Sequence, residues 1–145
     1  MPTKKSLVPK RPFFTFAFFG WLAFVTYSSL TSFSDIDTES FGFEIPHADK
    51  IVHFIFYATA SFLGVFFLRE QRRWSVKLRK ALVLMFFLTV AYGIIIEVLQ
   101  YSYTTSREGD VFDAIANSFG SFCGILASSF LFFRKGLAEW EITGS

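Results

Sequence analysis

Several polar residues of this 145-residue chain lie within long apolar stretches, where an unpaired charge is costly to bury. His53 lies in the stretch that begins at Ile51, and Glu97 directly follows three isoleucines. Asp113 and Asn117 stand four residues apart near the start of the last apolar stretch. An imidazole, two carboxylates and an amide can bind polar ligands, transfer protons or hold a divalent cation. We therefore expect these side chains to face a protein interior rather than lipid.

The spacing of the polar and small residues predicts three inward helix faces. The first face contains Asp49, His53 and Tyr57, and the second contains Gly93, Glu97 and Gln100. The third contains Asp113, Asn117, Gly120 and Gly124. Steps of three and four residues bring side chains to one face of a helix. The last two glycines form a G-x-x-x-G pair, which lets a neighbouring membrane helix approach closely.

Four apolar stretches, at about 13–32, 51–68, 81–101 and 111–133, must position these faces. The chain is 52% hydrophobic, with 22 phenylalanines and a mean hydropathy of +0.44, which is too apolar for one soluble core of this size. Each stretch approaches the roughly 20 residues that cross about 30 Å of hydrocarbon. We predict an all-α integral membrane four-helix bundle that forms a single domain over 1–145, its first stretch a retained anchor because it exceeds a signal-peptide h-region.

The basic residues predict the orientation of this bundle. Twelve of the 14 Lys and Arg residues fall in the two tails and in the link between the second and third stretches, which leaves only Lys50 and Arg107 for the other links. The positive-inside rule then predicts cytoplasmic termini, N-in and C-in. The ends that carry His53, Glu97 and Asp113 would face outward. A basic rim beside anionic lipid headgroups needs no nucleic-acid partner.

These elements predict a polar pocket at the outer side of the membrane. Its expected lining is His53, Glu97, Gln100, Arg107, Asp113 and Asn117, with Asp49, Lys50, Tyr57, Gly93, Gly120 and Gly124 in supporting positions. We expect Asp49 to cap the second helix, Lys50 to extend toward headgroups, and Arg107 to lie over the mouth of the pocket. In the alternative interpretation, Glu97 hydrogen-bonds His53 or Asn117, and such polar pairs only lock the helices together.

Three segments of the chain resemble the VanZ-like family of small bacterial membrane proteins. They read DKIVHFIFYATASFLG, AYGIIIEVLQ and SREGDVFDAIANSFGSFCG, and they follow one another over about 49–124. The residues that match the family pattern are Asp49, Lys50, His53, Gly93, Glu97, Gln100, Arg107, Asp113, Asn117 and Gly120. The resemblance implies a multi-pass protein of the bacterial inner (cytoplasmic) membrane. It also implies a cell-envelope role, because the family is associated with low-level resistance to the glycopeptide antibiotic teicoplanin.

Two functions of different classes fit these residues. The pocket could bind a membrane lipid headgroup, a lipid-linked envelope precursor or a glycopeptide-related ligand. Alternatively, an enzyme could act on a lipid-linked substrate, with His53 and Glu97 or Asp113 as acid and base or as metal ligands. The chain has no nucleophile elbow and no H-E-x-x-H motif. We therefore favour the binding protein over the enzyme, and we expect no cofactor and no metal centre.

The charge distribution predicts which links are accessible from outside an intact cell. In a Cys123→Ala background, a cysteine at Thr105 should react with a membrane-impermeant maleimide, and a cysteine at Ser75 should react only after the membrane is opened. Labelling of Ser75 alone in intact cells would reverse the orientation and move the polar residues to the cytoplasmic side.

Overall fold

The computed structural model describes residues 12–31, 47–71, 76–103 and 111–134, and helices are the only regular secondary structure in these ranges. The four helices are α1 (Phe13–Leu30), α2 (Ala48–Glu70), α3 (Leu78–Tyr103) and α4 (Val111–Phe133). All four are long and apolar enough to cross a membrane. The predicted all-α four-helix architecture is thereby confirmed, with α2 and α3 longer at both ends than the sequence indicated.

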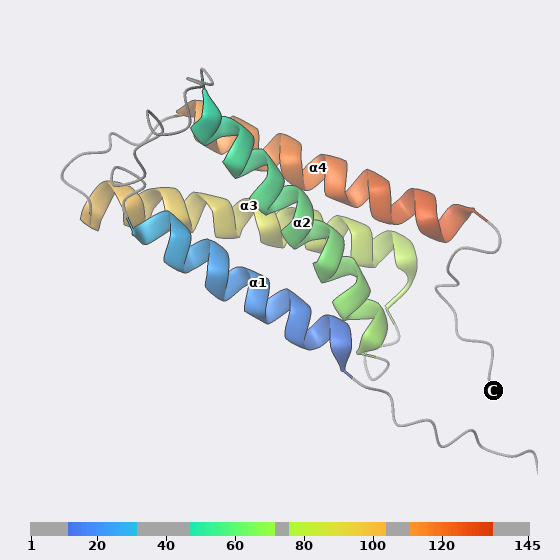
Figure 1. The fold of residues 1–145 in the computed structure, drawn as a ribbon. Helices are drawn as coiled ribbons and strands as arrows, with labels where there is room; N and C mark the ends of the chain where they lie inside the picture. The colour runs from blue at the N-terminus through green and yellow to red at the C-terminus, as the bar shows by residue number, and fades with distance from the viewer. Residues whose placement is uncertain (1–11, 32–46, 72–75, 104–110, 135–145) are drawn as a thin grey trace, which may run out of the picture.

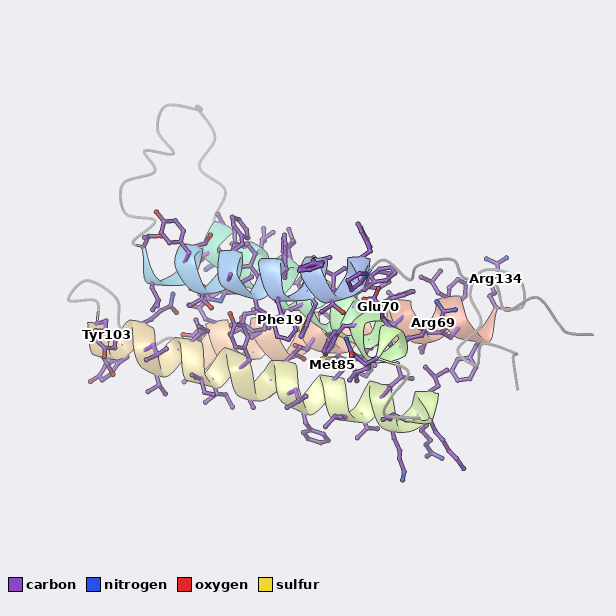
Figure 2. The ribbon with its side chains drawn as sticks, turned by 90° about the horizontal axis from the view of Figure 1, so that it is seen from below. Phe19, Arg69, Glu70, Met85, Tyr103 and Arg134 are labelled. Atoms are coloured by element: carbon purple, nitrogen blue, oxygen red, sulfur yellow. The ribbon has the colours of Figure 1, made fainter. Side chains whose placement is uncertain are left out.

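Consecutive helices run in opposite directions along the bundle (Figure 1). The N-terminal ends of α2 and α4 and the C-terminal end of α3 therefore lie at the same end. Figure 2 shows Tyr103, the last residue of α3, at the opposite end from Arg69, Glu70 and Arg134. The helix ends that carry the predicted site are thus brought together by the topology alone.

Helix α2 lies at the centre of the bundle and makes its most extensive contact with α4. This contact is close because α4 presents small residues to α2. A Cβ atom on Gly120 would collide with the carbonyl oxygen of Phe54, and one on Gly124 would collide with the carbonyl oxygen of Ala58. The two glycines therefore let the backbones of α2 and α4 approach one another directly.

The interior of the bundle combines small and polar side chains with apolar ones such as Met85 and Ile96, and many other large apolar side chains lie on the outside. Ser61, Ser121 and Ser128 are fully buried, and the Ser61 hydroxyl donates a hydrogen bond of 3.0 Å to the carbonyl of Ser121. Large apolar side chains such as Phe16 and Phe87 are more than 60% exposed. This distribution suits a hydrocarbon solvent, in which close packing and internal hydrogen bonds, rather than burial of apolar surface, hold helices together.

A second polar contact joins α1 and α2 at the opposite end of the bundle. Glu70, expected in a link, is the last residue of α2, and its carboxylate accepts hydrogen bonds from the backbone N–H of Thr15 at 2.6 Å and from its hydroxyl at 2.8 Å. Thr15 lies in the first turn of α1, where backbone N–H groups have no partner within the helix. Glu70 therefore satisfies and electrostatically stabilises the start of α1.

The α2–α4 contact predicts a large difference between two glycines. Gly120→Leu should lower stability by more than the roughly 1–3 kcal/mol typical of overpacking, because the new side chain meets backbone that cannot move aside. Gly20→Leu is the matched control, since a Cβ there meets nothing within 4 Å and a leucine improves helix propensity. Thermal melting in detergent measures both variants, and equal melting temperatures would contradict a close α2–α4 backbone contact.

Candidate functional site

The end of the bundle where α2 and α4 begin and α3 ends contains a group of contacting polar side chains. We call Lys50, His53, Glu97, Asp113 and Asn117 the polar cluster. Lys50 and His53 lie in the first two turns of α2, Asp113 and Asn117 in the first two turns of α4, and Glu97 near the end of α3. His53, Asp113 and Asn117 are buried, and Glu97 is half-buried. Three helices thus contribute to one site.

Asn117 is the residue that joins the three helices within the polar cluster. Its Nδ2 donates a hydrogen bond of 3.2 Å to Oε1 of Glu97, and its Oδ1 lies 2.9 Å from Nδ1 of His53. An amide oxygen can only accept a hydrogen bond. Nδ1 of His53 therefore carries a hydrogen and donates the hydrogen bond to Asn117. In the neutral imidazole, this leaves the lone pair on Nε2.

Asp113 lies between a cationic and an aromatic nitrogen. Its Oδ1 is 3.2 Å from Nζ of Lys50, and its Oδ2 is 3.9 Å from Nε2 of His53. The side chain of Lys50 is 24% exposed and that of Asp113 is 12% exposed, so the pair lies at the edge of the buried region. Lys50, expected to extend toward lipid headgroups, contacts the carboxylate of α4 instead.

Asp49 does not have the capping position that the sequence suggested. The N-cap of α2 is His47, which adopts a left-handed backbone conformation with φ of 61° and makes no capping hydrogen bond through its side chain. Asp49 lies within the first turn of α2, where a carboxylate still favours the positive end of the helix dipole. It is exposed, and its carboxylate lies 3.2 Å from Nζ of Lys50.

Gln100 of the expected lining bonds outside the polar cluster, and Tyr57, expected in a supporting position, is buried beside the cluster. Gln100 donates a hydrogen bond of 2.7 Å from Nε2 to the carbonyl of Ser29, which ties the end of α3 to α1. Tyr57 lies one helical turn beyond His53, is fully buried, and has no hydrogen-bond partner for its hydroxyl among the described residues. Arg107 is outside the described residues.

Gly93 has a packing role beside the polar cluster. A Cβ at this position would lie 3.0 Å from Cε1 of Tyr57 and 3.3 Å from Cβ and Nδ2 of Asn117. The missing side chain therefore lets α2 and α4 press against α3 one turn away from Glu97. This close approach brings the amide of Asn117 within hydrogen-bond distance of the carboxylate.

The sequence offered His53 or Asn117 as the partner of Glu97, and the hydrogen bond to Asn117 is present, but the sequence did not predict the pair of Lys50 and Asp113. Lys50 and His53 are three residues apart, so their shared helix face was a signal that Lys50 points toward the same site. The pairing of Lys50 with Asp113 depends on how α2 and α4 are aligned along their axes, which spacing within one helix does not determine. The same set of groups could also hold a metal ion, because His53, Glu97 and Asp113 each offer one ligand atom within 4.8 Å of the others.

The fold and the cluster define a four-helix membrane protein with a buried polar site at one end of the bundle. The VanZ/LLP1 family model matches residues 3–133, and the chain belongs to this family. The family resemblance noted in the sequence is thereby confirmed. No curated protein and no solved structure matches the chain.

Removal of the bridging amide should destabilise the bundle. Asn117→Ala removes the oxygen that accepts the hydrogen bond from Nδ1–H of buried His53 and the N–H that donates to Glu97, which should cost about 1–3 kcal/mol. The control is Ser102→Ala, because Ser102 is exposed and bonds only to the Val98 carbonyl of its own helix. Chemical denaturation in detergent measures the free energy of unfolding, and an Asn117→Ala variant as stable as Ser102→Ala would show that the bridge contributes nothing.

Proposed function

We propose that this VanZ/LLP1-family membrane protein binds the polar headgroup of a membrane lipid or of a lipid-linked envelope precursor at the polar cluster. The observation that supports this is the convergence of a lysine, an imidazole, two carboxylates and an amide from three membrane-spanning helices. Ionisable groups within membrane helices are expensive, and they commonly mark substrate or ion sites. The cluster lies near the helix ends, which are the parts of membrane-spanning helices that approach the headgroups.

The chemistry of the cluster matches the shared chemistry of these ligands. Lys50 supplies a positive charge for a phosphate, and Glu97 and Asp113 accept hydrogen bonds from hydroxyl or amine groups. The side chains of Lys50, Asp113 and Glu97 are 24%, 12% and 13% exposed, so part of each can contact a molecule outside the bundle. His53 and Asn117 are deeper and orient the carboxylates.

An apolar groove beside the cluster favours a lipid over a water-soluble ligand. Phe86 of α3 and Ala114, Ser118 and Phe122 of α4 line this groove, which is shallow and open along its outer side. Ala114 and Ser118 directly follow Asp113 and Asn117 in the sequence, so the groove runs along the same turns of α4 as the cluster. An acyl or polyprenyl chain in the groove would keep its headgroup next to the carboxylates.

The family association with glycopeptide resistance makes an envelope precursor one of the two ligand sources. The enzymatic alternative has less support, because no hydroxyl or thiol of the described residues forms a hydrogen bond with His53. Within those residues, His53 therefore has no side-chain nucleophile to activate.

Native mass spectrometry of the purified protein in EDTA tests the proposal, with bilayer phospholipids in one arm and a lipid-linked sugar precursor in the other. We expect one ligand class to bind saturably, and Lys50→Met should weaken its binding by about tenfold or more, since each charge-assisted hydrogen bond contributes about 1.5–3 kcal/mol. Lys80→Met is the control, because Lys80 is exposed near the start of α3. Equal lipid binding by Lys50→Met, Lys80→Met and the unmodified protein would refute headgroup recognition at the cluster.

A further inference from the structure

We propose that His53, Glu97 and Asp113 form a binding site for a divalent transition-metal ion of the zinc class. The three residues come from α2, α3 and α4, and one ligand atom of each lies within 4.8 Å of the other two. From the sequence, these residues were metal ligands only in the enzymatic alternative, because they share no short motif along the chain. Only the packing of the three helices brings them together.

The hydrogen bond to Asn117 prepares His53 as a ligand. Because Nδ1 donates to Asn117, the lone pair of the neutral imidazole is on Nε2, which lies 3.9 Å from Oδ2 of Asp113. This separation is too long for a direct hydrogen bond, and both atoms are acceptors. A metal ion about 2.0–2.2 Å from each atom fits between a nitrogen and an oxygen at such a separation.

Each of the three ligands also has a supporting contact from outside the ligand set. Asn117 accepts a hydrogen bond from Nδ1 of His53 and donates one to Glu97. Lys50 contacts Oδ1 of Asp113, and Oδ2 of the same carboxylate faces the imidazole. Metal-binding histidines usually donate their second N–H to an oxygen, and metal-binding carboxylates are themselves hydrogen-bonded. The polar cluster already has this arrangement.

The donor set selects the class of ion. Calcium and magnesium prefer oxygen ligands alone, whereas an imidazole with two carboxylates suits Zn²⁺ or Mn²⁺. In a tetrahedral site with bonds of about 2.1 Å, ligand atoms lie about 3.4 Å apart, so separations of up to 4.8 Å must shorten by about an ångström or more when the ion binds. Three protein ligands leave a coordination position open for water or for an oxygen of a bound molecule.

Metal binding goes beyond the proposed headgroup binding and is measured without any lipid ligand. Isothermal titration of the EDTA-treated, desalted protein in detergent should show one Zn²⁺ bound per chain. Asp113→Asn should weaken this binding at least about tenfold. The control is Asp49→Asn, because Asp49 and Asp113 both lie 3.2 Å from Nζ of Lys50, but only Asp113 faces His53. Equal affinity in the two variants, or no saturable binding in the unmodified protein, would overturn the proposal.

A spectroscopic measurement keeps the proposal testable even if Asp113→Asn does not fold. Pulsed electron paramagnetic resonance of the unmodified protein loaded with Mn²⁺ should show coupling to one imidazole nitrogen. This coupling should persist in His47→Asn, since His47 is exposed and asparagine tolerates its left-handed backbone, and it should vanish in His53→Asn. Bound Mn²⁺ without nitrogen coupling in the unmodified protein would exclude His53 as a ligand, whatever the outcome of the lipid-binding experiment.

Discussion

The backbone contact between α2 and α4 is the constraint on which the site depends. Gly120 lies against the carbonyl of Phe54, which directly follows His53, and Asn117 lies one helical turn before Gly120. The absence of a side chain on Gly120 therefore fixes both the distance and the axial alignment at which His53 meets Asn117. A membrane helix pair with larger residues here would separate, and the hydrogen bond of 2.9 Å between the two side chains could not form.

This contact also explains why charged groups are tolerated inside an apolar bundle. Hydrocarbon offers no hydrogen bonds, so every buried polar group must find its partner in the protein. The side-chain oxygen of Asn117 accepts a hydrogen bond from His53, and its nitrogen donates one to Glu97. The ammonium of Lys50 donates one to Asp113. At the opposite end, Glu70 satisfies the free backbone N–H of Thr15. The bundle is thus held by polar contacts at both ends and by small residues between α2 and α4.

The sequence predicted the elements well and the pairings poorly, for a physical reason. Apolar runs of membrane-spanning length fix the number of helices, and the spacing of His53, Glu97 and Asn117 within each helix fixes which face is inward. The rotation and axial alignment between helices depend on packing, which is why Lys50 was not expected to reach Asp113 and Gln100 was not expected to bond Ser29 of α1. The N-cap was misassigned because the cap of α2 is His47, which precedes Asp49 by two residues.

The two oxygens of Asp113 connect the proposed metal and headgroup functions. Oδ1 is held by Lys50, and Oδ2 faces His53, so a cation at Oδ2 leaves the ammonium in place at the more exposed edge. Lys50 and a bound ion would then present two cationic groups side by side, which suits a phosphate oxygen better than either group alone. The deeper groups His53 and Asn117 would act on such a ligand only through the ion. In such an arrangement, Glu97 and Asp113 are ligands of the ion together with His53, and Lys50 and the open coordination position of the ion face the headgroup.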